Sequence, residues 1–164
     1  MNRPSCLLLV VLLVAACSGS SKSSTTGGGG GGSQPAEKVL VDVDADGVGL
    51  GGHDPLGYRQ FNKAVTGLPE HTTKFGGATY KFSSAAHVTD FAGAEHAPGY
   101  GGYCAYAASM GRLSSANPLV FEIYEGKLLV FTNEEFRELF KQDPAGTKAK
   151  ADAAWPDLVA KHGK

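Results

Sequence analysis

The side chains that could do chemistry gather in one short stretch, residues 96–106. They are His96, Tyr100, Tyr103, Cys104 and Tyr106. A thiolate and an imidazole, together with a thioether, suit copper best and zinc next as metal ligands, and a cysteine beside a histidine can also act as a nucleophile with its base. Three glycines in the stretch permit positive φ and close approach of the backbone, so we expect a shaped loop rather than a regular helix or strand.

Two residues outside that loop complete a candidate metal site. His53 lies in a turn that the following Asp-Pro pair constrains, and Met110 lies on a helix expected over residues 105–112. We predict that Cys104, His53 and His96 bind a copper or zinc ion, with Met110 as a weaker fourth ligand. The corresponding function is a binding protein that buffers or transfers a soft or borderline metal ion, with copper favoured.

Two other functions fit the same loop. In the first, the chain is a non-enzymatic module for a small ligand or for a protein of the cell envelope, and Tyr100, Tyr103 and Tyr106 line its pocket or contact patch. In the second, Cys104 is a nucleophile activated by a histidine within hydrogen-bond distance. The sequence contains no motif of a known cysteine hydrolase. We therefore predict a binding protein without catalytic residues rather than an enzyme.

The N-terminal residues predict export and lipidation. An apolar run ends in the sequence VAAC at Cys17, which resembles the lipobox of bacterial lipoproteins. We expect a signal peptide over residues 1–16, lipid on Cys17, and a disordered tether over residues 17–38 that is rich in glycine and serine. The lipid is the predicted contact with the membrane, and Ser18 favours the outer membrane with the domain facing the periplasm. An ordinary signal peptide with cleavage nearby is the alternative.

Composition narrows the range of partners. The chain has 164 residues and a formal net charge of −1, with no run of Lys or Arg, so it lacks the basic footprint with which proteins bind DNA or RNA. Its N-terminal apolar run is shorter than the about 20 residues that span a bilayer. Because Cys6 leaves with the signal peptide and Cys17 carries lipid, Cys104 has no partner for a disulfide.

Hydrophobic patterning predicts one domain over residues 39–164. Its class is α+β, with antiparallel β-hairpins packed against short helices. Hairpin turns are expected at Gly76-Gly77 and Glu125-Gly126. No internal repeat is evident.

Helix starts are marked by capping residues. Ser83 or Ser84 caps a short helix in which His87 is expected to be a solvated residue, and Asn133 caps the clearest helix of the chain. A further helix is expected over residues 147–155, ended or kinked by the proline that follows.

The segment DVDADG at residues 42–47 matches the first half of a calcium loop. His53 stands where a bidentate glutamate should close such a site, and no amphipathic helix precedes the segment. A short strand followed by an Asp/Gly turn is therefore favoured over calcium binding.

Six segments of the chain carry a family resemblance. In order they are DADGV (44–48), GHDP (52–55), GATYKFSS (77–84), APGYGGYCA (97–105), EGKL (125–128) and AWP (154–156). Through them the chain resembles the YHS-domain family of small bacterial proteins. The resemblance implies a small α+β domain and an association with metals, since related domains occur in copper-transporting P-type ATPases. The family usually has tyrosine where this chain has His53 and His96, and related metal domains use several cysteines where only Cys104 remains here.

Overall fold

The structure is a computed structural model that describes residues 38–164. The predicted signal peptide, the predicted lipid attachment at Cys17 and the predicted tether up to residue 37 lie outside the described residues. Among the residues that are described, no helix combines the length and the apolar character that crossing a membrane requires.

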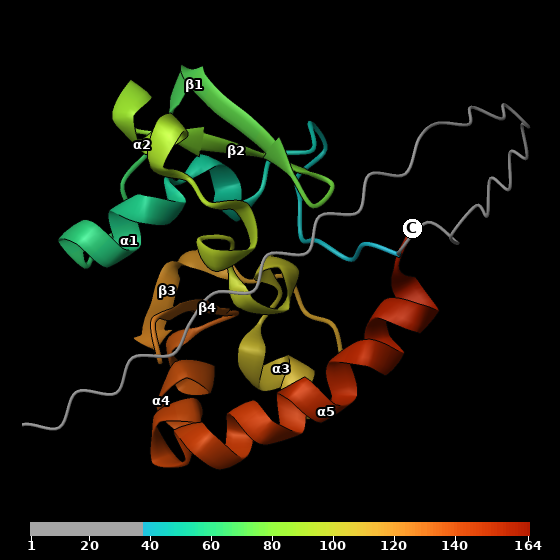
Figure 1. The fold of residues 1–164 in the computed structure, drawn as a ribbon. Helices are drawn as coiled ribbons and strands as arrows, with labels where there is room; N and C mark the ends of the chain where they lie inside the picture. The colour runs from blue at the N-terminus through green and yellow to red at the C-terminus, as the bar shows by residue number, and fades with distance from the viewer. Residues whose placement is uncertain (1–37) are drawn as a thin grey trace, which may run out of the picture. The chain divides into compact units, whose positions relative to one another are not determined.

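The described chain is a small α+β domain in which antiparallel hairpins pack against short helices, so the predicted fold class is confirmed (Figure 1). The strands are β1 (Leu68–Phe75), β2 (Ala78–Phe82), β3 (Asn117–Tyr124) and β4 (Lys127–Phe131). The α-helices are α1 (Pro55–Phe61), α2 (Ala85–Asp90), α3 (Ala105–Ser109), α4 (Glu134–Gln142) and α5 (Pro144–His162). Three 3₁₀ turns complete the fold, η1 (Leu50–Gly52), η2 (Gly93–Glu95) and η3 (Gly99–Gly102). Both predicted hairpins are present, β1 with β2 and β3 with β4.

Helix α5 is longer than the sequence predicts. It continues through Pro156, where the prediction ended or kinked a helix over residues 147–155. Ala151 and Leu158, on either side of the proline, are both buried in a cluster with Ala108 of α3. Packing of this kind on both sides of a proline outweighs the missing backbone hydrogen bond.

The domain contains an internal repeat, so the expectation of no repeat was wrong. Residues 49–91 and residues 99–140 follow the same order: a 3₁₀ turn, a short α-helix, a β-hairpin and a second α-helix. We call these segments the first repeat and the second repeat. In Figure 1 the first repeat, with α1, β1, β2 and α2, fills the upper part of the domain, and the second repeat lies below it.

The turn that opens each repeat shows the correspondence most closely. Its φ angles are 54°, 56° and 79° at residues 50–52, and 50°, 58° and 85° at residues 100–102. Consecutive left-handed residues are uncommon, and they are rarer still when the first is not glycine. Here the first is Leu50 in one repeat and Tyr100 in the other, so the same unusual backbone occurs twice.

The two hairpins also share their register. In each, a strand of eight residues pairs with a strand of five across a two-residue turn. Leu68 pairs with Phe82 and Asn117 pairs with Phe131, and the same register shift follows both pairs. The sequence hides this repeat because the two copies share an apolar pattern, a turn glycine and a helix cap rather than a run of identical residues.

A common core joins the repeats. Tyr58 of α1 is buried in one cluster with Leu128 and Val130 of β4. Its hydroxyl donates to the carbonyl oxygen of Pro118 at 2.9 Å, and its ring meets Phe121 edge-on at 4.8 Å between centroids. Because this tyrosine belongs to the first repeat and its partners to the second, the two repeats are packed as one unit.

Candidate functional site

Each repeat buries the residue that caps its first helix, and the two residues differ in chemistry. Asp54 caps α1 and Cys104 caps α3. Both are 0% exposed. The same position therefore holds a carboxyl in the first repeat and a thiol in the second, and the surroundings of each decide what that position can do.

Asp54 joins three elements of the first repeat through five hydrogen bonds. Its Oδ1 accepts from the backbone N–H groups of Leu56 at 2.9 Å and Gly57 at 3.3 Å, in the first turn of α1. Its Oδ2 accepts from the amide of Ser83 at 2.8 Å, from the hydroxyl of Ser83 at 2.6 Å, and from Nδ1 of His87 at 2.5 Å. The carboxyl thus ties α1 to the end of β2 and to α2.

The hydrogen bonds to Asp54 also decide its charge. Burial by itself raises the pKa of the Asp54 carboxyl. The bonds from the hydroxyl and amide of Ser83 and from His87 outweigh this effect, so the pKa lies below its ordinary value of 3.8. The first repeat therefore contains a buried carboxylate at neutral pH.

His87 lies between Asp54 and the protein surface. Because a carboxylate only accepts, Nδ1 of His87 carries the hydrogen that is donated to Asp54. Nε2 lies 2.6 Å from Oε1 of Gln60 on α1. A side-chain amide offers an oxygen acceptor or, after a flip, N–H donors, so Gln60 can meet either protonation state of this nitrogen. We call Asp54, Ser83, His87 and Gln60 the Asp54 network.

The second repeat lacks polar groups at three of the four positions of this network, and the fourth, that of Ser83, is taken by Thr132, whose hydroxyl bonds to Ser114 and Ser115 instead. Sγ of Cys104 accepts the backbone N–H of Ala107 at 3.5 Å and lies in a cluster of buried aromatic and aliphatic side chains. Phe136 stands where the first repeat has its histidine, with its ring 5.1 Å from that of Tyr106. Met110 stands where the first repeat has its glutamine. The second repeat therefore has the same backbone arrangement as the first, with hydrocarbon and sulfur in place of the polar groups of Asp54, His87 and Gln60.

A cavity opens beside His87, between α1 and α2, and we call it the His87 pocket. Its volume is about 460 Å³, which is in the range of small-molecule sites. Its lining residues are Leu56, Arg59, Gln60, Ser84, Ala86, His87, Asp90 and His96. The pocket thus combines a wall that the Asp54 network holds in place with a few polar groups from neighbouring segments.

Backbone contacts orient two basic side chains of the His87 pocket. Nδ1 of His96 accepts the N–H of Ala92 at 2.8 Å, so the hydrogen of the neutral ring is on Nε2. Nη2 of Arg59 donates to the carbonyl oxygen of Glu95 at 2.7 Å. The Nε atom of Arg59 is buried and has no hydrogen-bond partner within residues 38–164. Arg59 and His96 thus bring a guanidinium and an imidazole N–H to the lining of the pocket.

The residues predicted to bind a metal ion lie in different surroundings. Cys104 is sealed in the core, and His96 uses Nδ1 as an acceptor and keeps a hydrogen on Nε2. His53 donates from Nδ1 to the carbonyl oxygen of Leu50 at 2.9 Å. Sδ of Met110 lies 3.3 Å from a guanidinium nitrogen of the nearby Arg112. The one sulfur expected to coordinate most strongly is thus the least accessible of the four side chains.

In the part of the chain that the structure describes, no group of three or more His, Cys, Asp or Glu side chains could hold a metal ion. The copper or zinc site through Cys104, His53, His96 and Met110 therefore stays a prediction.

The tyrosines predicted to line one pocket are divided between two sites of packing. Tyr100 and Tyr103 both lie against Trp155 of α5, with ring centroids 5.6 Å and 6.5 Å from it. The hydroxyl of Tyr100 donates to Oδ1 of Asp152 at 2.8 Å, and burial together with this carboxylate raises the pKa of Tyr100. Tyr106 packs in the second repeat instead. Tyr100 and Tyr103 line separate cavities, so the three rings do not surround a common ligand.

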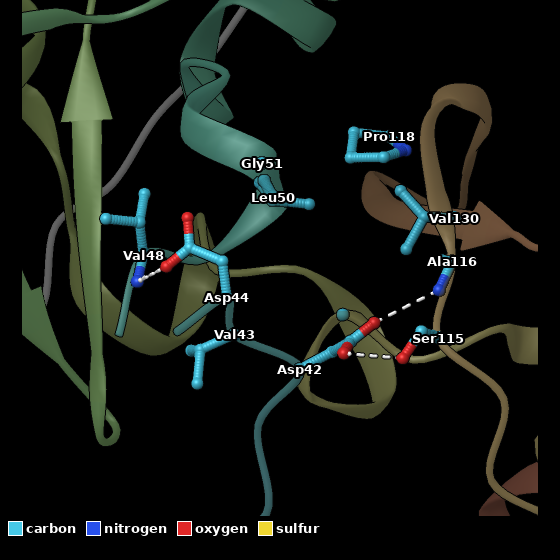
Figure 2. A pocket seen from close by; sticks show the side chains of 11 residues that line it. Asp42, Val43, Asp44, Val48, Leu50, Gly51, Ser115, Ala116, Pro118 and Val130 are labelled. Atoms are coloured by element: carbon cyan, nitrogen blue, oxygen red, sulfur yellow. Dashed lines mark hydrogen bonds between the residues drawn. The ribbon is translucent and has the colours of Figure 1, made fainter. Parts of the chain in front are cut away.

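A smaller cavity lies where the two repeats meet (Figure 2). Its volume is about 270 Å³, with Leu50 and Gly51 of the first repeat on one side and Pro118 and Val130 of the second on the other. In Figure 2 the side chain of Leu50 points into this space, toward Pro118 and Val130. Its walls are mainly apolar, and its carboxylates belong to the segment that precedes the first repeat.

Those carboxylates hold backbone turns. Oδ1 of Asp44 accepts from the N–H groups of Asp46 at 3.0 Å and Val48 at 2.8 Å. The carboxylate of Asp42 accepts from the hydroxyl of Ser115 and the N–H of Ala116, each at 3.0 Å, as Figure 2 shows. The predicted Asp/Gly turn is confirmed, but the short strand expected before it is not formed, because Val43 makes only an isolated bridge to Gly49.

Sequence reasoning missed Asp54 and His87 as site residues. His87 was expected to be solvated, but it is 8% exposed and bonded on both ring nitrogens, so that expectation was wrong. Two signals were present: an Asp directly before Pro55, which is a helix cap, and a Ser three residues before His87, which is another. Neither signal shows that residues 33 positions apart meet in the core.

Comparisons of the chain with protein-family models, with curated proteins and with solved structures found no match. The resemblance to the YHS-domain family therefore stays a prediction from the six segments named above.

Proposed function

We propose that the chain is a non-catalytic binding module that holds a small ligand in the His87 pocket. The observation that supports this proposal most strongly is the difference between the repeats. The first repeat has a buried Asp54–His87 pair beside a cavity of about 460 Å³, and the second repeat has Cys104 and Phe136 at the same two positions.

The energetics of burial support the same conclusion. The second repeat builds the same turn, hairpin and helices around Cys104 and Phe136, so the fold itself does not require a buried carboxylate. Replacing both partners of a buried hydrogen bond by apolar side chains of the same shape is nearly neutral or stabilising in many proteins. A polar pair that the fold does not require, and that forms the wall of a cavity, is best explained by what the cavity binds.

Metal buffering at the cell envelope is the second candidate function. One observation favours it: Nδ1 of His53 donates to a backbone carbonyl, which leaves Nε2 as a lone-pair donor in the arrangement common to metal-binding histidines. A single such nitrogen is weaker support than the His87 pocket. In either case the sequence supports a lipid on Cys17 as the attachment to the outer membrane.

A fragment screen followed by ¹H–¹⁵N correlation spectra of the purified chain tests the proposed function. Binding fragments are expected to shift the amide signals of Gln60, Ser84 and His87. Gln60→Leu keeps the Asp54–His87 pair but removes the polar group that meets Nε2, and it should weaken these fragments at least about tenfold. Met110→Leu changes the corresponding position of the second repeat and is the matched control, which should leave binding unchanged.

Two results would contradict the proposed function. One is the absence of any fragment that shifts amides of the His87 pocket. The other is equal binding by wild type and Gln60→Leu, because the Asp54 network would then have no part in recognition.

A further inference from the structure

We infer that the His87 pocket selects a small carboxylate and that Arg59 is the residue that pairs with it. This inference rests on the proposed function and goes beyond it, because it assigns a ligand class and a specificity-determining side chain.

Arg59 uses only part of the hydrogen-bonding capacity of its guanidinium. Its guanidinium is anchored at one end, where Nη2 donates to the carbonyl oxygen of Glu95 at 2.7 Å. Its Nε is buried and unpaired among the residues that the structure describes. A buried N–H group without an acceptor is unfavourable, and a carboxylate is the acceptor that matches a guanidinium through two parallel hydrogen bonds. Because Nε has almost no accessible surface in this structure, the Arg59 side chain must turn toward the pocket before a carboxylate can accept from it.

His96 supplies a second donor. Its Nδ1 accepts a backbone N–H, so Nε2 keeps its hydrogen in the neutral ring and in the charged ring alike. The side chain of His96 is 18% exposed, and its Nε2 lies 3.9 Å from Oε1 of Glu95. That glutamate is 72% exposed, so it is solvated and leaves Nε2 available to a ligand in the pocket.

The charged side chains near Arg59 favour a ligand that carries one negative charge. Lys127 lies near it and donates to the carbonyl oxygen of Ala94 at 2.6 Å. Burial lowers the pKa of Lys127, the positive charge of Arg59 lowers it further, and Glu95 opposes both effects. Two cations are therefore held at neighbouring carbonyl groups of η2. Asp90, the acidic residue of the pocket lining, disfavours a second anionic group on the ligand.

The apolar residues of the pocket lining determine what can be attached to the carboxylate of the ligand. Leu56 and Ala86 present hydrocarbon to the cavity, and a volume of about 460 Å³ accommodates a carboxylate attached to a small apolar group. A flat monocarboxylate such as benzoate has this chemistry, and benzamide has the same shape without the charge.

Titration of the ¹⁵N-labelled chain with benzoate and with benzamide tests the inference. Benzoate is expected to shift the amides of Gln60, His87 and His96, and benzamide is expected to bind at least about tenfold more weakly. Arg59→Gln should weaken benzoate to a similar extent, and Arg59→Lys should give an intermediate affinity because it keeps the charge but loses the fork. Arg112→Gln changes an exposed arginine outside the pocket and should have no effect. The dispersed amide spectrum of each variant shows that it is folded.

Each other outcome has a definite meaning. Equal binding of benzoate and benzamide, or benzoate binding that Arg59→Gln does not weaken, would overturn the carboxylate inference and leave the binding function intact. Benzoate shifts that map away from the His87 pocket, or no shifts at all, would also overturn the inference. The fragment screen with Gln60→Leu decides the proposed function independently of both.

Discussion

At the start of α1 the protein buries a carboxylate, and at the start of α3 it buries a thiol in the same place. The carboxylate of Asp54 receives five hydrogen bonds, whereas Cys104 lies among aromatic and aliphatic side chains. The turns before the two residues and the hairpins after them are alike. The difference teaches that the shape of the fold and the polarity of this position are set by separate residues.

The features that specify the shape occur in both repeats. Ser84 and Asn133 each cap the second helix of their repeat by accepting a backbone N–H three residues later. Gly49 and Gly99 occupy the same position, and an added Cβ would press against Tyr80 in one repeat and Leu129 in the other. Because these features are duplicated and the Asp54 network is not, the network is the better guide to function.

Removal of the carboxyl from the first repeat should have the largest effect on stability. Asp54→Ala leaves Ser83 and His87 without their shared acceptor, and each buried donor left without a partner costs about 1–3 kcal/mol. Cys104→Ala is the matched change in the second repeat, and it should cost only about 1–2 kcal/mol because little volume is lost. Urea unfolding measures both. Equal losses would break the proposed contrast between the repeats.

Glycine-to-alanine substitutions in the two left-handed turns should have the next largest effect on the free energy of unfolding. An alanine Cβ at Gly101 would collide with the carbonyl oxygen of Leu40, whereas at Gly51 it would lie 3.2 Å from Cγ of Pro118. Gly101→Ala should therefore cost about 2–4 kcal/mol and Gly51→Ala about 1–2 kcal/mol, since positive φ strains both but overpacking affects the first more. A larger loss for Gly51→Ala in denaturant unfolding would show that the turns are not packed as described.

Cys104→Ser tests whether the thiol of the second repeat has a role beyond packing. The change should cost about 1–2 kcal/mol, because a hydroxyl is less favourable than a thiol among apolar side chains. The copper and zinc content of the purified chain, measured by mass spectrometry, should be the same in wild type and variant. A metal ion that is present in wild type and lost in this variant would support the predicted metal site at Cys104 and contradict a purely structural role for the second repeat.

The pH dependence of stability should give the smallest effect. The pKa of Asp54 is lower in the folded chain than its ordinary value of 3.8. Its stabilising contribution is therefore complete above that value and is lost as the pH falls through it toward the folded pKa. Between about pH 5 and about pH 3, wild type should lose more free energy of unfolding than Asp54→Asn, by less than about 1.4 kcal/mol per pH unit. Parallel curves for the two proteins would contradict an ionised Asp54.

Local features of the fold could be predicted from the sequence. The turns at Gly76-Gly77 and Glu125-Gly126, the caps Ser84 and Asn133, and the α+β class depend on residues that lie close together in the chain. The internal repeat could not be predicted in the same way, because its two copies share backbone angles and strand register rather than residue identity.

The site depends on contacts between distant residues, and this is where sequence reasoning failed. A lone histidine in a first helical turn is typical of a solvated residue, and only the fold brings His87 to a carboxylate 33 positions earlier. Prediction concentrated on Cys104 because thiols are reactive, whereas burial in an apolar cluster makes this thiol inaccessible. His96 was predicted to bind a metal ion; in the structure it lines the His87 pocket, and its Nδ1 accepts the N–H of Ala92.

The most direct test gives the first repeat the residues of the second. The double variant Asp54→Cys, His87→Phe removes both partners of the buried pair together, and Ser83, whose amide and hydroxyl also donate to Asp54, loses that acceptor. Our account predicts a folded chain whose free energy of unfolding is within about 2 kcal/mol of wild type, and which no longer binds the fragments that occupy the His87 pocket. A variant that binds those fragments as wild type does, or that cannot fold, would contradict the claim that the Asp54 network serves binding rather than the fold.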